Sequence, residues 1–409
     1  MYLATTRSAD TPRRERGGAR RAVAGNVLAL GMVSLITDIS AEMVTAVLPL
    51  YLVLGLGFSP LQFGLLDGLY SAVTAIVRVL GGHLADRWQR RKLVAGLGYG
   101  MSAVAKLGLI AAGGSAAAMG LVLAVDRTGK GLRTAPRDAL ISLSTPEDQQ
   151  GRAFGIHRAM DTVGAFLGPL TAFLLLGFVA GGYDTVFFVS FCFATLGVLV
   201  FGLFVRDQRG PATTERIPLR ASFNLLRGKR FRKIVGWATL LGLVTVGDSF
   251  LYLLLQKRLE LEPAYIAMLP LGTAGVYLLL AMPFGKLADR IGRWQVFIGG
   301  HVLLLLAYAL VAGLADGIVL LFGALLAHGM FYAATDGVLM AAVAPLLPED
   351  QRTSGMAVLQ TAQAVAKLLS AVAFGAAWTW WGLYPAVLVA CGALAIVVAG
   401  AMFRLREAR

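Results

Sequence analysis

Cysteine, histidine and charged side chains are all scarce in this chain. Its two cysteines, Cys192 and Cys391, lie far apart within apolar segments, so they offer neither a disulfide framework nor the spacing of a metal site. Its four histidines are scattered, which leaves no set of metal ligands and no clustered nucleophile and base for an enzyme. Only 15% of its residues are charged, against roughly 25% in soluble globular chains. These absences predict a membrane protein that is not an enzyme and that uses no metal and no cofactor.

Long apolar segments make up most of the chain. Hydrophobic residues account for 57% of the sequence, and the mean hydropathy is +0.72. A helix of about 20 apolar residues crosses a bilayer. Runs of this length fall near 24–54, 62–85, 92–113, 117–142, 151–178, 184–205, 232–256, 261–286, 293–314, 317–345, 352–376 and 381–403. The sequence therefore predicts an all-α membrane protein with twelve transmembrane helices, six on each side of a polar stretch at 206–231.

Two short strings are repeated at nearly the same offset. The string G-x-L-A-D-R occurs at 82–87 and again at 285–290, and the string P-E-D-Q occurs at 146–149 and again at 348–351. The copies are 203 residues (285 − 82) and 202 residues (348 − 146) apart, which indicates a duplicated half. We therefore expect two pseudo-symmetric six-helix bundles around a central cavity. The expected divisions are a basic arm at 1–23, an N-terminal bundle at 24–205, a linker at 206–231 and a C-terminal bundle at 232–409.

The distribution of arginine and lysine predicts the orientation in the membrane. Basic residues gather in the N-terminal arm, near 86–92, in the linker, near 286–293 and at the C-terminal end, whereas the alternate loops have almost none. By the positive-inside rule, both termini and the linker are cytoplasmic, as in a plasma membrane of the bacterial inner-membrane type. Orientation also accounts for the net charge of +14, so we expect contact with the lipid bilayer and none with nucleic acid. We expect the chain to be a monomer.

Ionisable residues within the apolar runs are the candidates for function, because a charge inside a bilayer is costly. Asp38 and Glu42 lie four residues apart and so share one helix face, where they could bind protons or a cation, or pair with arginines of a neighbouring helix. Asp126, Lys130, Arg133 and Arg137 fall in a stripe of about 60° on the fourth run, which indicates a polar interior. The candidates for binding substrate or protons are Asp38, Glu42, Asp126, Arg127, Lys130, Arg158, Asp161, Asp248, His328, Asp336, Gln360, Gln363 and Lys367.

Two of these candidates have open alternatives. His328 could relay protons, since histidine titrates near neutral pH, or it could be bonded to backbone. Lys367 needs a counter-charge, which Asp336 or Asp248 could supply.

The motifs resemble those of the major facilitator superfamily. The loop motif G-x-L-A-D-R-x-G-R-K/R is matched by Gly82, Leu84, Ala85, Asp86, Arg87, Arg90 and Arg91, with Gln89 in place of glycine. The fourth run is similar to the family's L-x-x-x-R-x-x-Q-G pattern through Leu123, Arg127 and Gly131, with Lys130 in place of glutamine. The fifth run resembles the glycine-proline motif of antiporter members through Gly155, Gly164, Gly168 and Pro169, although Ala172 and Phe173 replace its final glycine pair.

This resemblance implies roles for the motif residues. The two copies of the loop motif imply a gating latch formed by Gly82, Asp86, Arg87, Arg90, Arg91, Asp289, Arg290 and Arg293. The fifth-run motif implies a hinge at Gly155, Gly164, Gly168 and Pro169, because glycines permit close helix packing and proline removes a backbone hydrogen bond.

The resemblance also implies a function. A member of this family is a secondary active transporter that exposes one central site alternately to each side of the membrane. The antiporter-like motif favours proton-coupled efflux of a small molecule. The alternative is an importer or uniporter with the same fold. A non-transporting membrane sensor is less favoured, because the sequence has no long loop or soluble domain for that role.

Overall fold

The protein is helical throughout the parts of the chain that the structure describes. The computed structural model describes residues 15–88, 90–146, 150–179, 182–208, 225–347 and 352–406. No β-strand occurs in these ranges. The expected all-α fold class is therefore confirmed.

Six long helices form the first half of the chain. They are α1 (Glu15–Leu50, extended by η1, Tyr51–Gly55), α2 (Pro60–Trp88), α3 (Arg91–Ala111), α4 (Ala116–Leu143), α5 (Gln150–Phe178) and α6 (Tyr183–Phe204). Each begins and ends within a few residues of a predicted apolar run, except that α1 extends further toward the N-terminus.

The second half contains more helical pieces, because some of its spans are interrupted. They are η3 (Leu225–Arg227), α8 (Lys229–Leu243), α9 (Asp248–Leu259), α10 (Pro263–Ile266), α11 (Leu269–Ile291), α12 (Arg293–Ala309), η4 (Leu310–Leu314), α13 (Gly317–Val343), η5 (Ala344–Leu346), α14 (Arg352–Trp381) and α15 (Leu383–Arg406). Gly292 joins α11 to α12 directly, at a positive φ of 110° that glycine adopts without steric cost.

Ten segments of the described chain are long and apolar enough to cross a bilayer. The helices α2 and α4 are not among the ten, although they are 29 and 28 residues long. Six ionisable residues within α4 lower its hydropathy. The protein is thus a multi-pass membrane protein, and α4 is the helix whose charges most need partners from its neighbours.

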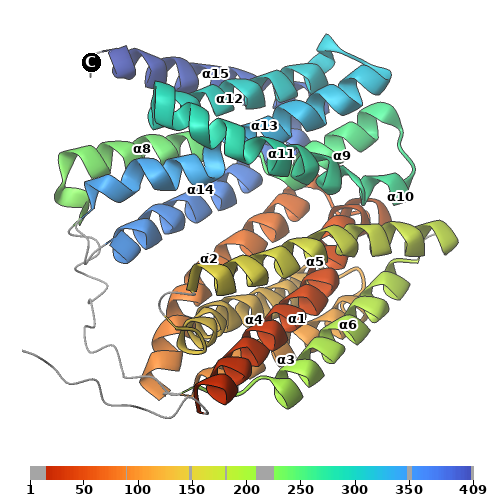
Figure 1. Cartoon of the computed structure of the whole chain (residues 1–409). Coiled ribbons are helices and arrows are strands. Elements are labelled where there is room, and N and C mark those ends of the chain that lie inside the picture. Colours follow the sequence, from red (N-terminus) through yellow and green to blue (C-terminus); the bar gives the residue numbers. More distant parts are fainter. Residues whose placement is uncertain are drawn as a thin grey trace, which may run out of the picture.

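The helices of the two halves gather separately. Figure 1 shows α1–α6 in the lower part of the molecule and α8–α15 in the upper part. Within the lower group, α1 packs on α5 and α6, and α4 packs on α2 and α3; within the upper group, α13 packs on α11 and α12. The most extensive contact between the groups joins α2 to α14.

Glycines allow α2 and α14 to approach so closely. A Cβ at Gly64 would collide with the carbonyl oxygen of Ala371, and one at Gly68 would lie 3.1 Å from the Cα of Leu368. In the opposite direction, a Cβ at Gly375 would collide with the carbonyl oxygen of Pro60. All three contacts involve the N-terminal part of α2 and the C-terminal half of α14, so the two halves meet there.

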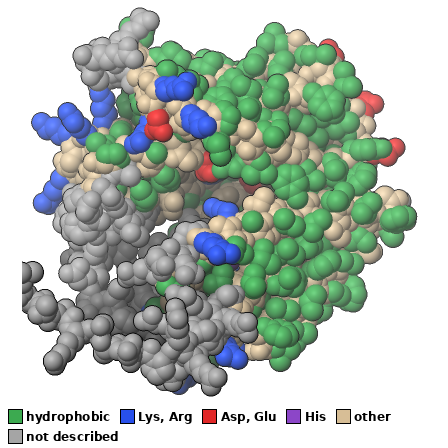
Figure 2. Space-filling view, in the orientation of Figure 1, with side chains coloured by type: hydrophobic (Ala, Val, Ile, Leu, Met, Phe, Trp, Pro, Cys, Tyr) green, Lys and Arg blue, Asp and Glu red, His purple; other side chains and the backbone are tan. Residues whose placement is uncertain are grey.

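The outer flanks are apolar and a hollow separates the two groups. Figure 2 shows hydrophobic side chains covering the visible flanks, whereas Lys, Arg, Asp and Glu side chains lie beside a hollow between the upper and lower helices. Apolar flanks suit a lipid environment, and charged side chains beside a hollow suit water.

The seventh apolar run is broken, where the sequence predicts one continuous helix. Helix α8 ends at Leu243 and α9 begins at Asp248, so 244–247 is not helical. The Val246 N–H donates to the Tyr308 hydroxyl at 2.7 Å, and Ser370 Oγ donates to the carbonyl oxygen of Thr245 at 2.6 Å. Neighbouring side chains thus bond the backbone groups that the break frees, as a break within a membrane requires.

Candidate functional site

A buried carboxylate, Asp126, organises the charged helix α4. It forms ion pairs with Lys106 of α3 and with its own neighbour Arg127, and it accepts a hydrogen bond of 2.5 Å from Ser102 Oγ. The guanidinium of Arg127 also stacks on the ring of Tyr70, 3.7 Å from its centroid. Asp126 and Arg127 are both buried. Their charges are therefore compensated within the protein, and they join α4 to α2 and α3.

The two carboxylates of α1 approach the next cations along α4. Asp38 Oδ1 lies 3.8 Å from Arg133 Nη2, and Glu42 Oε1 lies 3.9 Å from Lys130 Nζ. The Glu42 and Lys130 side chains are 29% and 30% exposed, whereas Asp38 is 13% exposed. The pairing between α1 and α4 matches one of the two alternatives that the sequence left open. Because Glu42 and Lys130 are the more accessible pair, an incoming solute would reach them first.

Asp38 also meets a carboxyl group of α5. Asp161 lies near enough to Asp38 for the two carboxyl groups to interact, and it accepts a hydrogen bond of 2.9 Å from Ser34 Oγ of α1. Arg158 Nη1 lies 3.4 Å from Asp161 Oδ2, and the Arg158 side chain is mostly exposed. Two carboxyl groups form a hydrogen bond only when one of them carries a proton. Asp38 and Asp161 thus bring two interacting carboxyl groups together on neighbouring helices.

The glycine motif of α5 packs against this pair. A Cβ at Gly164 would lie 2.5 Å from the carbonyl oxygen of Leu35 and 3.1 Å from the Cβ of Asp38, and one at Gly168 would lie 2.8 Å from the Cβ of Glu42. Pro169 follows Gly168 and is buried inside α5. Gly155 makes no such approach, because the space around its Cβ position is open. Two of the four predicted hinge residues thus form the close contact between α1 and α5.

A second polar cluster lies in the other half, at the start of α9. Tyr332 Oη donates to both carboxylate oxygens of Asp248 at 2.5 Å, and His328 Nε2 lies 3.4 Å from Asp248 Oδ1. His328 Nδ1 lies 3.4 Å from Thr273 Oγ1, whose hydroxyl accepts from Tyr252. The ring nitrogens of His328 thus face side chains, and no backbone bond to them is seen among the described residues. Asp248, His328 and Tyr332 join α9 to α13.

The remaining candidates of this half are separate from that cluster. Asp336, one turn beyond Tyr332 on α13, is exposed and accepts a hydrogen bond of 3.2 Å from the Tyr277 hydroxyl. Gln360 and Lys367 of α14 are exposed, and Gln363 is half-buried. Within the described chain, Lys367 forms no ion pair with Asp248 or Asp336, although its charge acts on Asp248 through space. Of the two carboxylates that the sequence offered as a counter-charge for Lys367, Asp248 is thus one on which its charge acts, without a direct ion pair.

Asp67 of α2 belongs to the site, and sequence reasoning missed it. Ser249 Oγ of α9 donates to Asp67 Oδ1 at 2.9 Å, so this hydrogen bond crosses between the two halves of the chain. The charge of Lys367 also acts on Asp67 through space. The sequence feature that could have indicated Asp67 is a single carboxylate between Gly64 and Gly68 in an otherwise apolar run.

The predicted latch is described in part. The surroundings of Gly82 and the side chains of Asp86 and Arg87 lie outside what the structure describes. Arg90 is exposed and Arg91 is buried. In the second copy, Arg293 lies 3.3 Å from Asp289 and donates to the carbonyl oxygen of Ala341 at 2.7 Å, while Arg290 is exposed. Arg293 thus holds the junction of α11 and α12 against the end of α13.

Taken with the apolar flanks, this geometry defines a class of protein: a multi-pass helical membrane protein with ionisable side chains beside an internal hollow. Comparison with known proteins gives the family. The chain belongs to the Major Facilitator Superfamily, whose model matches residues 30–276 and 249–409. This confirms the resemblance that the loop motif indicated.

Relatives support the same assignment along the chain. An uncharacterized MFS-type transporter of Methanocaldococcus jannaschii is 29% identical over 393 residues, which covers 93% of this chain and 94% of the relative. An uncharacterized protein of Mycobacterium tuberculosis is 33% identical over 157 residues, which is 38% of each chain.

Solved structures of transporters share the fold. The nucleoside transporter NupG superposes with a TM-score of 0.78 at 16% identity, over 92% of this chain and 98% of that one. A POT family transporter in complex with 5-aminolevulinic acid has a TM-score of 0.74 at 14% identity, over 93% and 95% of the two chains. A bacterial homolog of the human lysosomal transporter Spinster, inward-facing and occupied, has a TM-score of 0.73 at 18% identity, over 97% and 98%. At these identities, the likeness establishes a transporter fold and no substrate.

Proposed function

We propose that this protein is a secondary active transporter that moves a small molecule by alternating access. Its proposed direction is efflux, driven by coupling to protons. In this proposal, residues 24–205 and 232–409 are two pseudo-symmetric six-helix bundles, and α2 and α4 complete a count of twelve spans. The arm at 1–23, the linker at 206–231 and both termini are cytoplasmic in a membrane of the bacterial inner-membrane type. The chain works as a monomer around the central cavity.

The observation that carries proton coupling is the carboxyl pair of Asp38 and Asp161. The two groups come from α1 and α5, interact with each other, and have Arg133 and Arg158 beside them. Asp161 is 22% exposed, so a proton can reach the pair from water. A cationic group of a substrate, or a closer approach of Arg133, would displace the shared proton. Glu42 and Lys130 are the proposed first contacts for substrate.

The contact of α2 with α14 supports alternating access. It closes the halves near the start of α2 and the end of α14, and the Asp67–Ser249 hydrogen bond lies beside it. With the proposed orientation, this is a conformation open to the cytoplasm. Opening the other side requires this contact to separate, while the latch residues of the two loop motifs come together.

Flux measurements test the function. The substrate would first be sought by comparing the small molecules in cells that lack the protein with those in cells that overproduce it. In inverted membrane vesicles with an acidic interior, a proton-coupled exporter should accumulate that substrate, and collapse of the pH gradient should abolish the accumulation. Equilibration without accumulation would instead indicate a uniporter, and depletion from the vesicles would indicate an importer. A protein that changes no solute flux would overturn the proposal.

A further inference from the structure

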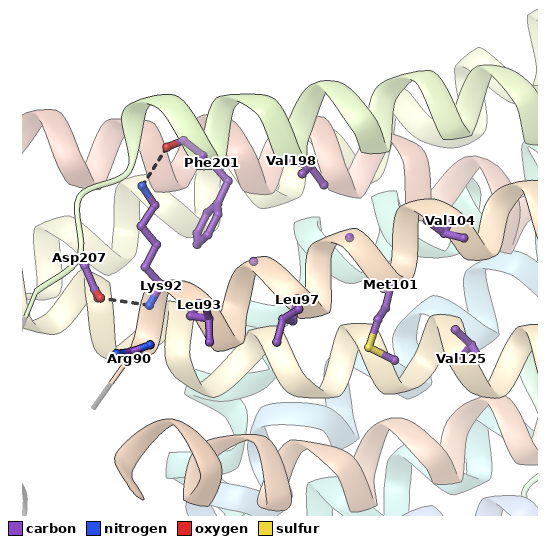
Figure 3. A pocket seen from close by; sticks show the side chains of 13 residues that line it. Arg90, Lys92, Leu93, Leu97, Met101, Val104, Val125, Val198, Phe201 and Asp207 are labelled. Atoms are coloured by element: carbon purple, nitrogen blue, oxygen red, sulfur yellow. Dashed lines mark hydrogen bonds between the residues drawn. The ribbon is translucent and has the colours of Figure 1, made fainter. Parts of the chain in front are cut away.

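A lipid-facing groove runs between α3 and α6, remote from the contact between the two halves. Figure 3 shows the helices on either side of it, with Leu93, Leu97, Met101 and Val104 along one wall and Val198 on the other. Its volume is about 890 Å³. Leu97 and Val104 are 55% and 66% exposed. In a membrane, side chains so exposed on the outer flank meet acyl chains, so this groove opens to lipid.

Glycines make the groove. Gly96 and Gly100 on α3 and Gly202 on α6 line it, and a Cβ at Gly100 or Gly202 would meet no atom within 4 Å. The missing side chains therefore leave space that protein does not fill. From Lys92 to Val104 the groove follows α3 for about 18 Å at 1.5 Å per residue, close to the roughly 15 Å depth of one leaflet's hydrocarbon.

The end of the groove nearest the linker carries positive charge. Arg90, which is exposed, and Lys92, which is half-buried, line it there together with one exposed carboxylate, Asp207. Lys92 Nζ donates to the carbonyl oxygen of Gly202 at 2.8 Å, and Asp207 accepts from the backbone N–H of Lys92 at 3.2 Å (Figure 3). The Lys92 ammonium thus bonds to a neutral carbonyl and keeps further donors. Two cations at the headgroup level above an apolar channel complement an anionic headgroup above an acyl chain.

We propose that this groove is a binding site for an anionic phospholipid of the cytoplasmic leaflet. The phosphate binds Arg90 and Lys92, and one acyl chain lies along Gly96 and Gly100 toward Val104. The occupied groove then fills the space between α3 and α6. The site rests on the orientation proposed above, whereas binding itself requires no transport.

The headgroup is tested with a charge-removing variant. Native mass spectrometry of the purified full chain would count phosphatidylglycerol and phosphatidylcholine molecules that stay bound in a titration. Arg90→Gln with Lys92→Gln should weaken phosphatidylglycerol binding about 30-fold, which corresponds to about 1 kcal/mol for each basic side chain. The control Arg232→Gln with Lys233→Gln removes an adjacent, exposed pair of cations from α8 and should change nothing. Equal affinity for the two lipids, or equal losses in both double variants, would overturn the proposal.

The apolar part of the groove is tested by filling it with a larger side chain. Gly100→Leu should displace the acyl chain without a clash, since the space at its Cβ is open, and should abolish retention of the lipid. Gly299→Leu is the matched control, because Gly299 is an exposed helical glycine of α12 with equally open space. Thermal unfolding of both variants checks that they are folded. If Gly100→Leu retains phosphatidylglycerol as the wild type does, the groove holds no acyl chain. Absence of transport by the wild type, with lipid binding intact, would count against the proposed function and not against this site.

Discussion

Asp126 is the most heavily compensated charge of the described chain. Its carboxylate meets Lys106, Arg127 and Ser102. A buried carboxylate of this kind stabilises the fold through its partners, since Lys106 and Arg127 would otherwise be bare cations in an apolar interior. Their position indicates a role in packing α4 on α3 rather than in binding a solute.

Removal of Asp126 should therefore destabilise the protein. Asp126→Asn leaves Lys106 and Arg127 without a counter-charge, and the loss of one partner from a buried pair costs about 3–5 kcal/mol. We expect a clearly lower midpoint of thermal unfolding in detergent. Adding Lys106→Met to the same variant removes one uncompensated charge and should restore part of the loss. A single variant as stable as the wild type would show that the network does not hold α3 and α4 together.

Asp38 should be the residue whose protonation drives transport. Asp38→Asn imitates the protonated carboxyl group permanently, so gradient-driven flux in proteoliposomes should disappear while counterflow exchange of substrate persists. Asp316→Asn is the control, because Asp316 is an exposed carboxylate that pairs with Arg258 of α9.

Two other outcomes would reassign the role of Asp38. Undiminished accumulation by Asp38→Asn would move coupling to another carboxylate, with Asp161, Asp248 and Asp336 as the next candidates. Loss of exchange together with gradient-driven flux would indicate that Asp38 serves mainly to pair with Arg133.

At the scale of helices, the close contact of α5 with α1 leaves no room for a side chain at its glycines. Gly168→Val would place atoms against Glu42 and the Ile39 carbonyl oxygen, where even a Cβ lies only 2.8 Å away. We expect a folded protein that binds substrate but does not complete the transport cycle. Gly155→Val, on the same helix in open space, should transport normally. Equal activity of the two variants would mean that α5 and α1 move without needing this close contact.

The contact of α2 with α14 provides a second test at this scale. The Leu61 N–H donates to Thr379 Oγ1 at 3.0 Å, so these two positions adjoin across the halves. After replacement of Cys192 and Cys391, Leu61→Cys with Thr379→Cys should form a disulfide under mild oxidation and stop transport. Reduction should restore the flux. Transport that continues with the disulfide in place would show that this contact does not separate during the cycle.

At the scale of the whole molecule, the sequence predicted the features that depend on the length and hydropathy of its apolar segments. The all-α fold and most span boundaries followed from apolar runs of bilayer length, and the duplicated loop motif indicated the family. Contacts between halves were not predictable, because periodicity says nothing of which face meets the partner half. Asp67 was missed for this reason, and Lys367 was assigned a partner by charge alone. The break at 244–247 carries no proline, and the side chains that bond it, Tyr308 and Ser370, come much later in the sequence.

That broken span has a consequence for how the protein is made. Helices α8 and α9 contain 15 and 12 residues, or about 22 and 18 Å, and neither alone crosses roughly 30 Å of hydrocarbon. During synthesis the exposed peptide groups of 244–247 enter the bilayer before α12 and α14 exist to bond them. The segment must therefore insert as a provisional helix, or wait beside the translocation machinery, until Tyr308 and Ser370 arrive. The order of synthesis thus fixes when the C-terminal half acquires its final shape: only after its last helices have been made.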